Sequence, residues 1–203
     1  MGYYLRVLTK NDARVPATRM RERLAREKID AFLEVTDGSD EAWEELLLRH
    51  PDGKEIAQIW RNPVAEGELG GEEVTEFLED IAEQKPETAA EWLLDLLPKV
   101  RVVYAFQVLF LGADRGQGWE AIRAVEGEIW GALGGIFQSD GEGFSNEEGY
   151  HILWQFAPGV KGSWRMAVLD KAGRWVPFEM DLGNPEHKAA FLDGRVPEKV
   201  SRP

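Results

Sequence analysis

The stretch Gly134–Phe156 limits the fold of this chain more than any other, because an acidic glycine loop separates two strand-like segments. Large apolar side chains recur at every second position of the later segment, at Tyr150, Ile152, Trp154 and Phe156. Side chains two residues apart lie on the same face of a β-strand. The alternation therefore predicts a strand over residues 150–156 with these four side chains in the core.

The loop before this strand gathers four carboxylates among its glycines: Asp140, Glu142, Glu147 and Glu148. Glycine permits positive φ angles, so the loop can fold tightly and direct several carboxylates the same way. A calcium loop of the EF-hand type would need an oxygen ligand where Phe144 stands. We therefore predict an electrostatic surface patch without a bound metal.

Composition indicates a packed globular protein. The chain has 203 residues, is 43% hydrophobic and contains no cysteine, which excludes disulfides and thiolate chemistry. No run approaches the roughly 20 apolar residues of a membrane-spanning helix. The first residues lack the basic-then-apolar order of a signal peptide. A cytoplasmic location without membrane association is the simplest expectation.

The negative charge is concentrated in the middle of the chain. The formal net charge is -13, and residues 31–98 alone hold nineteen Asp and Glu against four Lys and Arg. Such a segment repels phosphate backbones, so direct nucleic-acid binding is not expected. A basic protein is the partner that this charge favours.

Strand and helix patterns alternate along the chain and predict an α+β protein with mainly antiparallel sheets and helices on one face. The expected strands are residues 3–9, 32–35, 44–50, 55–62, 102–111, 150–156, 163–170 and 174–182. The expected helices are residues 16–29, 72–85, 88–97, 119–133 and 185–191.

The order of these elements predicts two sequential βαβββα-like units, residues 1–98 and 99–194, followed by a poorly ordered tail, 195–203. The first unit ends in the extra helix 88–97. Both units contain a phenylalanine, then Asp-Gly, then a Glu-Glu pair and an apolar strand, for example at Asp37-Gly38 and Asp140-Gly141. An internal duplication and the convergence of two similar layouts are both open explanations.

Sequence motifs for catalysis or cofactor binding are sparse. Residues 116–121 fit the glycine pattern of dinucleotide-binding loops, but hairpins follow where that fold requires crossover helices. The three histidines, His50, His151 and His187, are not spaced as metal ligands on one element. No cofactor is predicted, and nucleotide binding at Gly116–Gly118 is left open.

One polar cluster follows from the predicted strands. The side chains on strand faces that point away from the core are His151, Gln155, Arg165, Glu179 and Asp181. If consecutive strands pair, these side chains share one surface of the sheet. They form either a structural ladder of charges or, together with the acidic loop, a binding site.

Two functional hypotheses follow from these patterns. The favoured one is a non-enzymatic cytosolic protein of bacterial type, adaptor-like or immunity-like, that binds a basic protein partner through its acidic surface. The alternative is an enzyme that depends on a small ligand or metal, with its site at the 134–156 loop and the face of His151.

Overall fold

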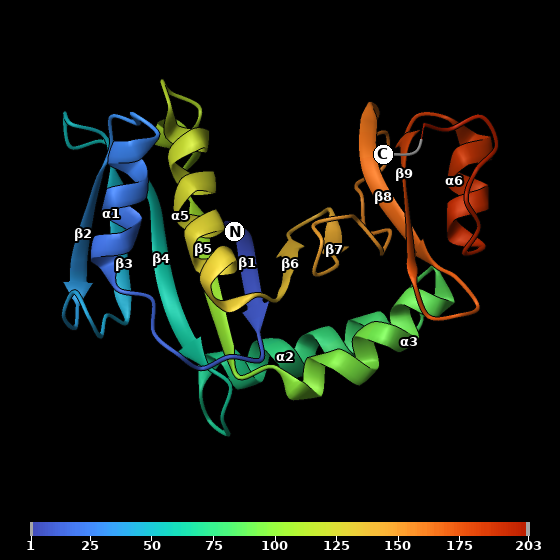
Figure 1. Cartoon of the computed structure of the whole chain (residues 1–203), viewed down its shortest axis with the longest axis horizontal. Coiled ribbons are helices and arrows are strands. Elements are labelled where there is room, and N and C mark those ends of the chain that lie inside the picture. The colour runs from blue at the N-terminus through green and yellow to red at the C-terminus, as the bar shows by residue number, and fades with distance from the viewer. Residues whose placement is uncertain (1, 202–203) are drawn as a thin grey trace. The chain divides into compact units, whose positions relative to one another are not determined.

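The computed structural model describes residues 2–201 and has an α+β fold whose strands pair mainly antiparallel (Figure 1). This confirms the predicted fold class. The chain forms two compact units. Unit 1 comprises the residues up to Glu72 together with Val100–Gly135, and unit 2 comprises Glu73–Lys99 together with the residues from Ile136 onward. The division into 1–98 and 99–194, and the duplication it implies, stay predictions.

In the described part of unit 1, five strands lie side by side in the order β2–β3–β4–β5–β1, each antiparallel to its neighbours. They are β1 (Tyr3–Thr9), β2 (Phe32–Asp37), β3 (Glu45–Arg49), β4 (Glu55–Pro63) and β5 (Val102–Val108). The helices are α1 (Ala17–Arg26), α4 (Phe110–Ala113), α5 (Gly118–Leu133) and α2 (Leu69–Ile81), the last of which continues into unit 2.

One face of this sheet is apolar and lies against α1 and α5 (Figure 1). A row of directly opposed residues crosses all five strands on this face: Val35, Leu46, Ile59, Phe106 and Leu5. The two helices also pack on each other, and Nη2 of Arg19 lies 2.6 Å from Oε1 of Glu128. Burial of this face supplies the core of unit 1.

The opposite face of the sheet carries polar and aromatic side chains. One row consists of Glu34, Leu47, Gln58, Gln107 and Tyr4. The next consists of Asp37, Glu45, Trp60, Ala105 and Arg6. All of these side chains except Ala105 are half-buried or exposed. The sheet therefore has one core face and one face with polar groups within reach of solvent.

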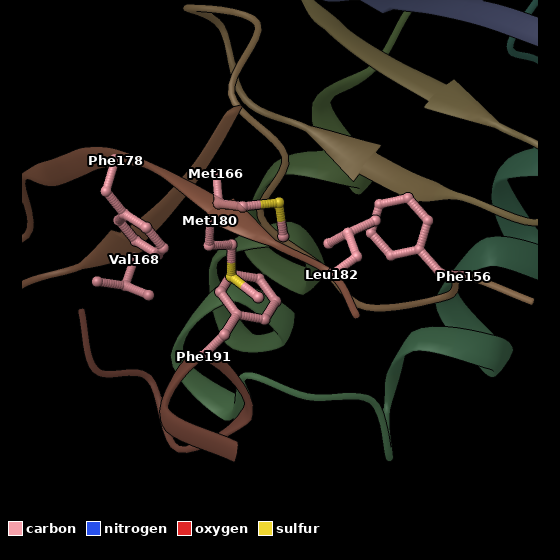
Figure 2. Close-up of a cluster of buried hydrophobic side chains, with 7 residues drawn as sticks. All are labelled: Phe156, Met166, Val168, Phe178, Met180, Leu182 and Phe191. Atoms are coloured by element: carbon pink, nitrogen blue, oxygen red, sulfur yellow. The ribbon is translucent and has the colours of Figure 1, made fainter. Parts of the chain in front are cut away.

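Unit 2 contains two antiparallel hairpins: β6 (Ile136–Ser139) pairs with β7 (Gly143–Ser145), and β8 (Ser163–Leu169) pairs with β9 (Trp175–Asp181). Its further elements are α3 (Glu87–Leu96), η1 (Leu97–Lys99) and α6 (Pro185–Leu192). The core beside β8, β9 and α6 consists of Phe156, Met166, Val168, Phe178, Met180, Leu182 and Phe191 (Figure 2). The side chain of Asn184 caps α6, because it accepts hydrogen bonds from the amides of Glu186 and His187.

The strand predicted over residues 150–156 is wrong, and its backbone hydrogen bonds give the reason. The amide of His151 donates to Arg165 O, that of Ile152 to Phe144 O, and that of Trp154 to Lys85 O. No single partner strand accepts all three bonds, so the stretch is irregular. Three consecutive side chains, residues 151–153, are buried in place of the expected alternation.

Two further expectations change at the ends of elements. The strand predicted over 102–111 ends at Val108, because the chain turns into α4 and the amide of Leu109 donates to Ile56 O. The described part of the predicted tail, 195–201, packs on unit 2 through Val196 and Val200. Residues 202–203 lie outside the described residues.

The closest backbone approach in unit 1 requires a glycine in α4. A Cβ atom on Gly112 would lie 2.0 Å from the carbonyl oxygen of Glu55, whereas one on Gly131 in α5 would meet nothing within 4 Å. We expect Gly112→Ala to lower the free energy of unfolding by about 1–3 kcal/mol. Gly131→Ala should raise it by about 0.5–1 kcal/mol, because alanine favours a helix interior. Chemical denaturation measures both changes, and equal stability of Gly112→Ala and wild type would contradict this approach.

Candidate functional site

The acidic loop predicted as a binding surface consists of two turns on either side of β7. Asp140 and Glu142 lie between β6 and β7 and are half-buried, whereas Glu147 and Glu148 are exposed in the second turn. Oδ1 of the buried Asn146 accepts a 3.1 Å hydrogen bond from the amide of Glu148 and holds this turn closed. The four carboxylates are therefore divided between two turns.

His151 is buried, with 3% of its surface exposed. Its Nε2 lies 2.8 Å from the carbonyl oxygen of Glu142, and its Nδ1 lies 3.3 Å from Oγ of Ser145. The neutral imidazole that donates from Nε2 and accepts at Nδ1 satisfies both contacts. The ring packs against Phe156 and Trp164, with centroids 4.7 and 5.6 Å away. The expectation that His151 faces away from the core is thereby corrected.

The five residues of the predicted polar cluster do not all lie together. Arg165 and Glu179 are directly opposed in the β8–β9 hairpin and exposed, and Asp181 lies two residues further along β9. Gln155 is half-buried, and its amide donates to Glu142 O, so it belongs with the loop and His151. Three of the five predicted side chains thus share an exposed surface, and two do not.

A more concentrated arrangement of charges lies in unit 1, at the end of the sheet where β2 and β4 end and β3 begins. A cavity of about 350 Å³ is found there. Its lining includes four carboxylates, two arginines and an indole: Asp37, Glu44, Glu45, Glu68, Arg14, Arg61 and Trp60. We call this the sheet-end pocket.

The strand register holds three side chains of the sheet-end pocket in one line. Asp37 is directly opposite Glu45, and Glu45 is directly opposite Trp60. Like charges at opposed positions of neighbouring strands destabilise a sheet. Among residues 2–201, no ion pair is found for the carboxylate of Asp37 or for that of Glu45. Asp37, Glu45 and Trp60 are not among the predicted site residues, because residue patterns do not show which strand positions face one another.

The two arginines of the sheet-end pocket, Arg61 buried and Arg14 exposed, belong to one polar network. Arg14 Nη1 donates to Trp43 O at 2.8 Å and also pairs with Glu44, while Arg61 Nη2 donates to Asp12 O at 3.1 Å. Burial raises the pKa of the Tyr104 phenol, although the guanidinium of Arg61 acts in the opposite direction. These contacts hold the segment before α1 against the sheet.

Close packing accounts for one of the glycines in the dinucleotide-like motif. A Cβ atom on Gly118 would lie 2.5 Å from the carbonyl oxygens of both Gly112 and Ala113. Glycine is therefore required where α4 meets the start of α5. Nucleotide binding at Gly116–Gly118 stays a hypothesis.

Comparison of the chain with protein-family models, curated proteins and solved structures finds no match. Within residues 2–201, no three His, Asp or Glu side chains are grouped so that they could hold a metal ion. In the same part of the chain, no helix combines the length and apolar character needed to cross a membrane.

The environment of His151 predicts a pH dependence of stability. Burial lowers the pKa of His151 from 6.5 to about 4, although its bond to the carbonyl of Glu142 acts in the opposite direction. The unfolded chain therefore binds a proton near pH 6.5 that the folded chain binds only near pH 4. Stability should fall as pH decreases across this interval, by up to about 3 kcal/mol from this group.

Chemical denaturation at a series of pH values measures this contribution. We expect His151→Gln to be less stable than wild type at neutral pH and to lose less stability on acidification. Identical slopes for wild type and His151→Gln would contradict the buried, neutral imidazole.

Proposed function

We propose that the protein is a non-catalytic binding protein whose sheet-end pocket receives a basic side chain of a partner protein. The observation that carries this proposal is the line of Asp37, Glu45 and Trp60 across three neighbouring strands. Two opposed carboxylates beside an indole are a favourable environment for an arginine or lysine of a partner. Such a cation relieves the repulsion between the carboxylates and packs on the aromatic ring.

The size and composition of the pocket support this proposal. Its volume of about 350 Å³ lies within the range of protein ligand sites, which starts near 300 Å³. Leu69 and Pro63 also line the pocket and add apolar surface for the aliphatic part of a long basic side chain. Leu69 is 66% exposed, so this apolar surface can be reached by a partner.

The charge of the surrounding chain supports a basic partner over other classes. The excess of carboxylates in residues 31–98 attracts basic surfaces over long distances and repels nucleic acids and acidic lipids. A chain without cysteine also fits a reducing compartment, so a cytoplasmic location belongs to this proposal. The carboxylates at Asp140, Glu142, Glu147 and Glu148 would add to the same attraction.

The test is the binding of a short fluorescein-labelled peptide of alternating arginine and glycine, followed by fluorescence anisotropy. We expect binding that weakens as salt is raised. Asp37→Asn combined with Glu45→Gln should reduce the affinity about tenfold, equivalent to about 1.4 kcal/mol. Trp60→Leu should weaken binding of the arginine peptide further, because it removes the aromatic face.

The matched control is Asp30→Asn combined with Glu120→Gln. It removes the same formal charge from exposed positions of unit 1 that do not line the pocket. This control should bind the peptide within about twofold of wild type, apart from a small loss of long-range attraction. If both double variants lost the same affinity for the peptide, binding would depend on net charge alone, which would contradict a specific pocket.

A further inference from the structure

The free edge of the unit-1 sheet presents backbone groups that can pair with another strand. β2 is the terminal strand of the order β2–β3–β4–β5–β1. The amide of Arg61 donates to Glu44 O, which fixes the alternation of hydrogen-bonded pairs between β3 and β4. By that alternation, Leu33 and Val35 direct their N–H and C=O groups away from β3. The edge of β2 is therefore formed by the backbone of these two residues.

A side-chain contact confirms this direction. Nε of Arg21 in α1 donates to the carbonyl oxygen of Leu33 at 2.8 Å, so that oxygen points outward. The guanidinium of Arg21 is held in turn by both carboxylate oxygens of Asp40, at 2.9 and 2.8 Å. Among residues 2–201, no partner is found for the outward N–H and C=O groups of Val35.

A groove of about 780 Å³ follows this edge. Its side-chain lining includes Phe32, Glu34, Arg49, Arg21, Asp40 and Asp52. Phe32 is 57% exposed, so its ring is within reach of a partner. Glu34 and Arg49 form an ion pair across β2 and β3. The groove thus combines a strand edge that is open at Val35, an exposed aromatic ring and charged groups.

We propose that an extended segment of the basic partner pairs antiparallel with β2 in this groove and becomes a sixth strand of the unit-1 sheet. This inference rests on the proposed function and specifies how the partner is bound. Only another extended backbone matches the alternating donors and acceptors of a strand edge. Antiparallel pairing continues the arrangement of every neighbouring pair in this sheet.

The two faces of β2 define the residues that the added strand should carry. Glu34 and Asp37 lie on the polar face of the sheet, so basic residues are favoured at the cross-strand positions of that face. Leu33 and Val35 lie on the apolar face, so aliphatic residues are favoured there. An alternating sequence of lysine and valine therefore represents the proposed partner.

A second copy of this chain is a poorer occupant of the same edge. Antiparallel pairing of two β2 strands centred on Glu34 would oppose two glutamates on the same face. Each chain also carries a formal net charge of -13. Like charge at the contact and over the whole chain disfavours this dimer, and sedimentation of the protein alone tests it directly. A dimer that Val35→Pro converts to a monomer would assign the edge to self-association and overturn the proposal.

The main test uses the acetylated and amidated peptide Lys-Val-Lys-Val-Lys-Val-Lys and two N-methylated analogues. In antiparallel pairing, the valines opposite Leu33 and Val35 exchange hydrogen bonds with β2, and the lysine amides point away. Methylation of the valine amides should therefore lower the affinity about tenfold or more, as expected for two or more lost hydrogen bonds. Methylation of the lysine amides should leave the affinity within about threefold.

The outcomes separate this inference from the proposed function. Equal binding of both analogues would overturn strand addition. Salt-sensitive binding of the arginine peptide that is lost in the double variant Asp37→Asn with Glu45→Gln would still support the sheet-end pocket. Selective loss on methylation of the lysine amides would overturn antiparallel pairing. Selective loss on methylation of the valine amides supports the inference, and Val35→Pro, which removes the outward N–H of residue 35, should then weaken binding of the parent peptide while the protein stays folded. Binding of neither the parent peptide nor the arginine peptide would overturn both proposals.

Discussion

The register of β3 against β4 determines what unit 1 can do. Because side chains alternate between the faces of a strand, a slip of one residue would exchange the core face for the polar face. The observed register directs Leu46 and Ile59 toward the helices, and it places Glu45 beside Trp60 on the other face. The core and the sheet-end pocket therefore depend on the same pairing, and the apolar face provides the energy that holds the carboxylates in position.

Much of the fold could be predicted from residue patterns, because most elements of this chain have a clear period and clear ends. The strands β1, β4, β8 and β9 and the helices α1, α3 and α5 lie close to their expected ranges. The stretch 150–156 has an equally clear period and nevertheless forms no strand. An alternating pattern predicts a strand only when one neighbour can accept its hydrogen bonds, and that condition depends on the tertiary structure.

The candidate site was less accessible to sequence reasoning. Asp37, Glu45 and Trp60 lie on separate strands and become neighbours only through the register. The alternation of Tyr150, Ile152, Trp154 and Phe156 assigns His151 to the strand face opposite the core. In the structure, both of its ring nitrogens have partners inside unit 2, so a polar residue type was compatible with burial. Residue type and spacing alone show neither that His151 is buried nor that Asp37, Glu45 and Trp60 are neighbours.

The irregular stretch 151–155 has a consequence for the cooperativity of unit 2. Its amides donate to β8, to β7, to the turn before β7 and to the segment that precedes α3. Because these amides donate to several different segments, all of these segments must separate before the amides become exposed to solvent. Unit 2 should therefore lose its structure as one cooperative body, with the slowest-exchanging amides in a segment that has no regular secondary structure of its own.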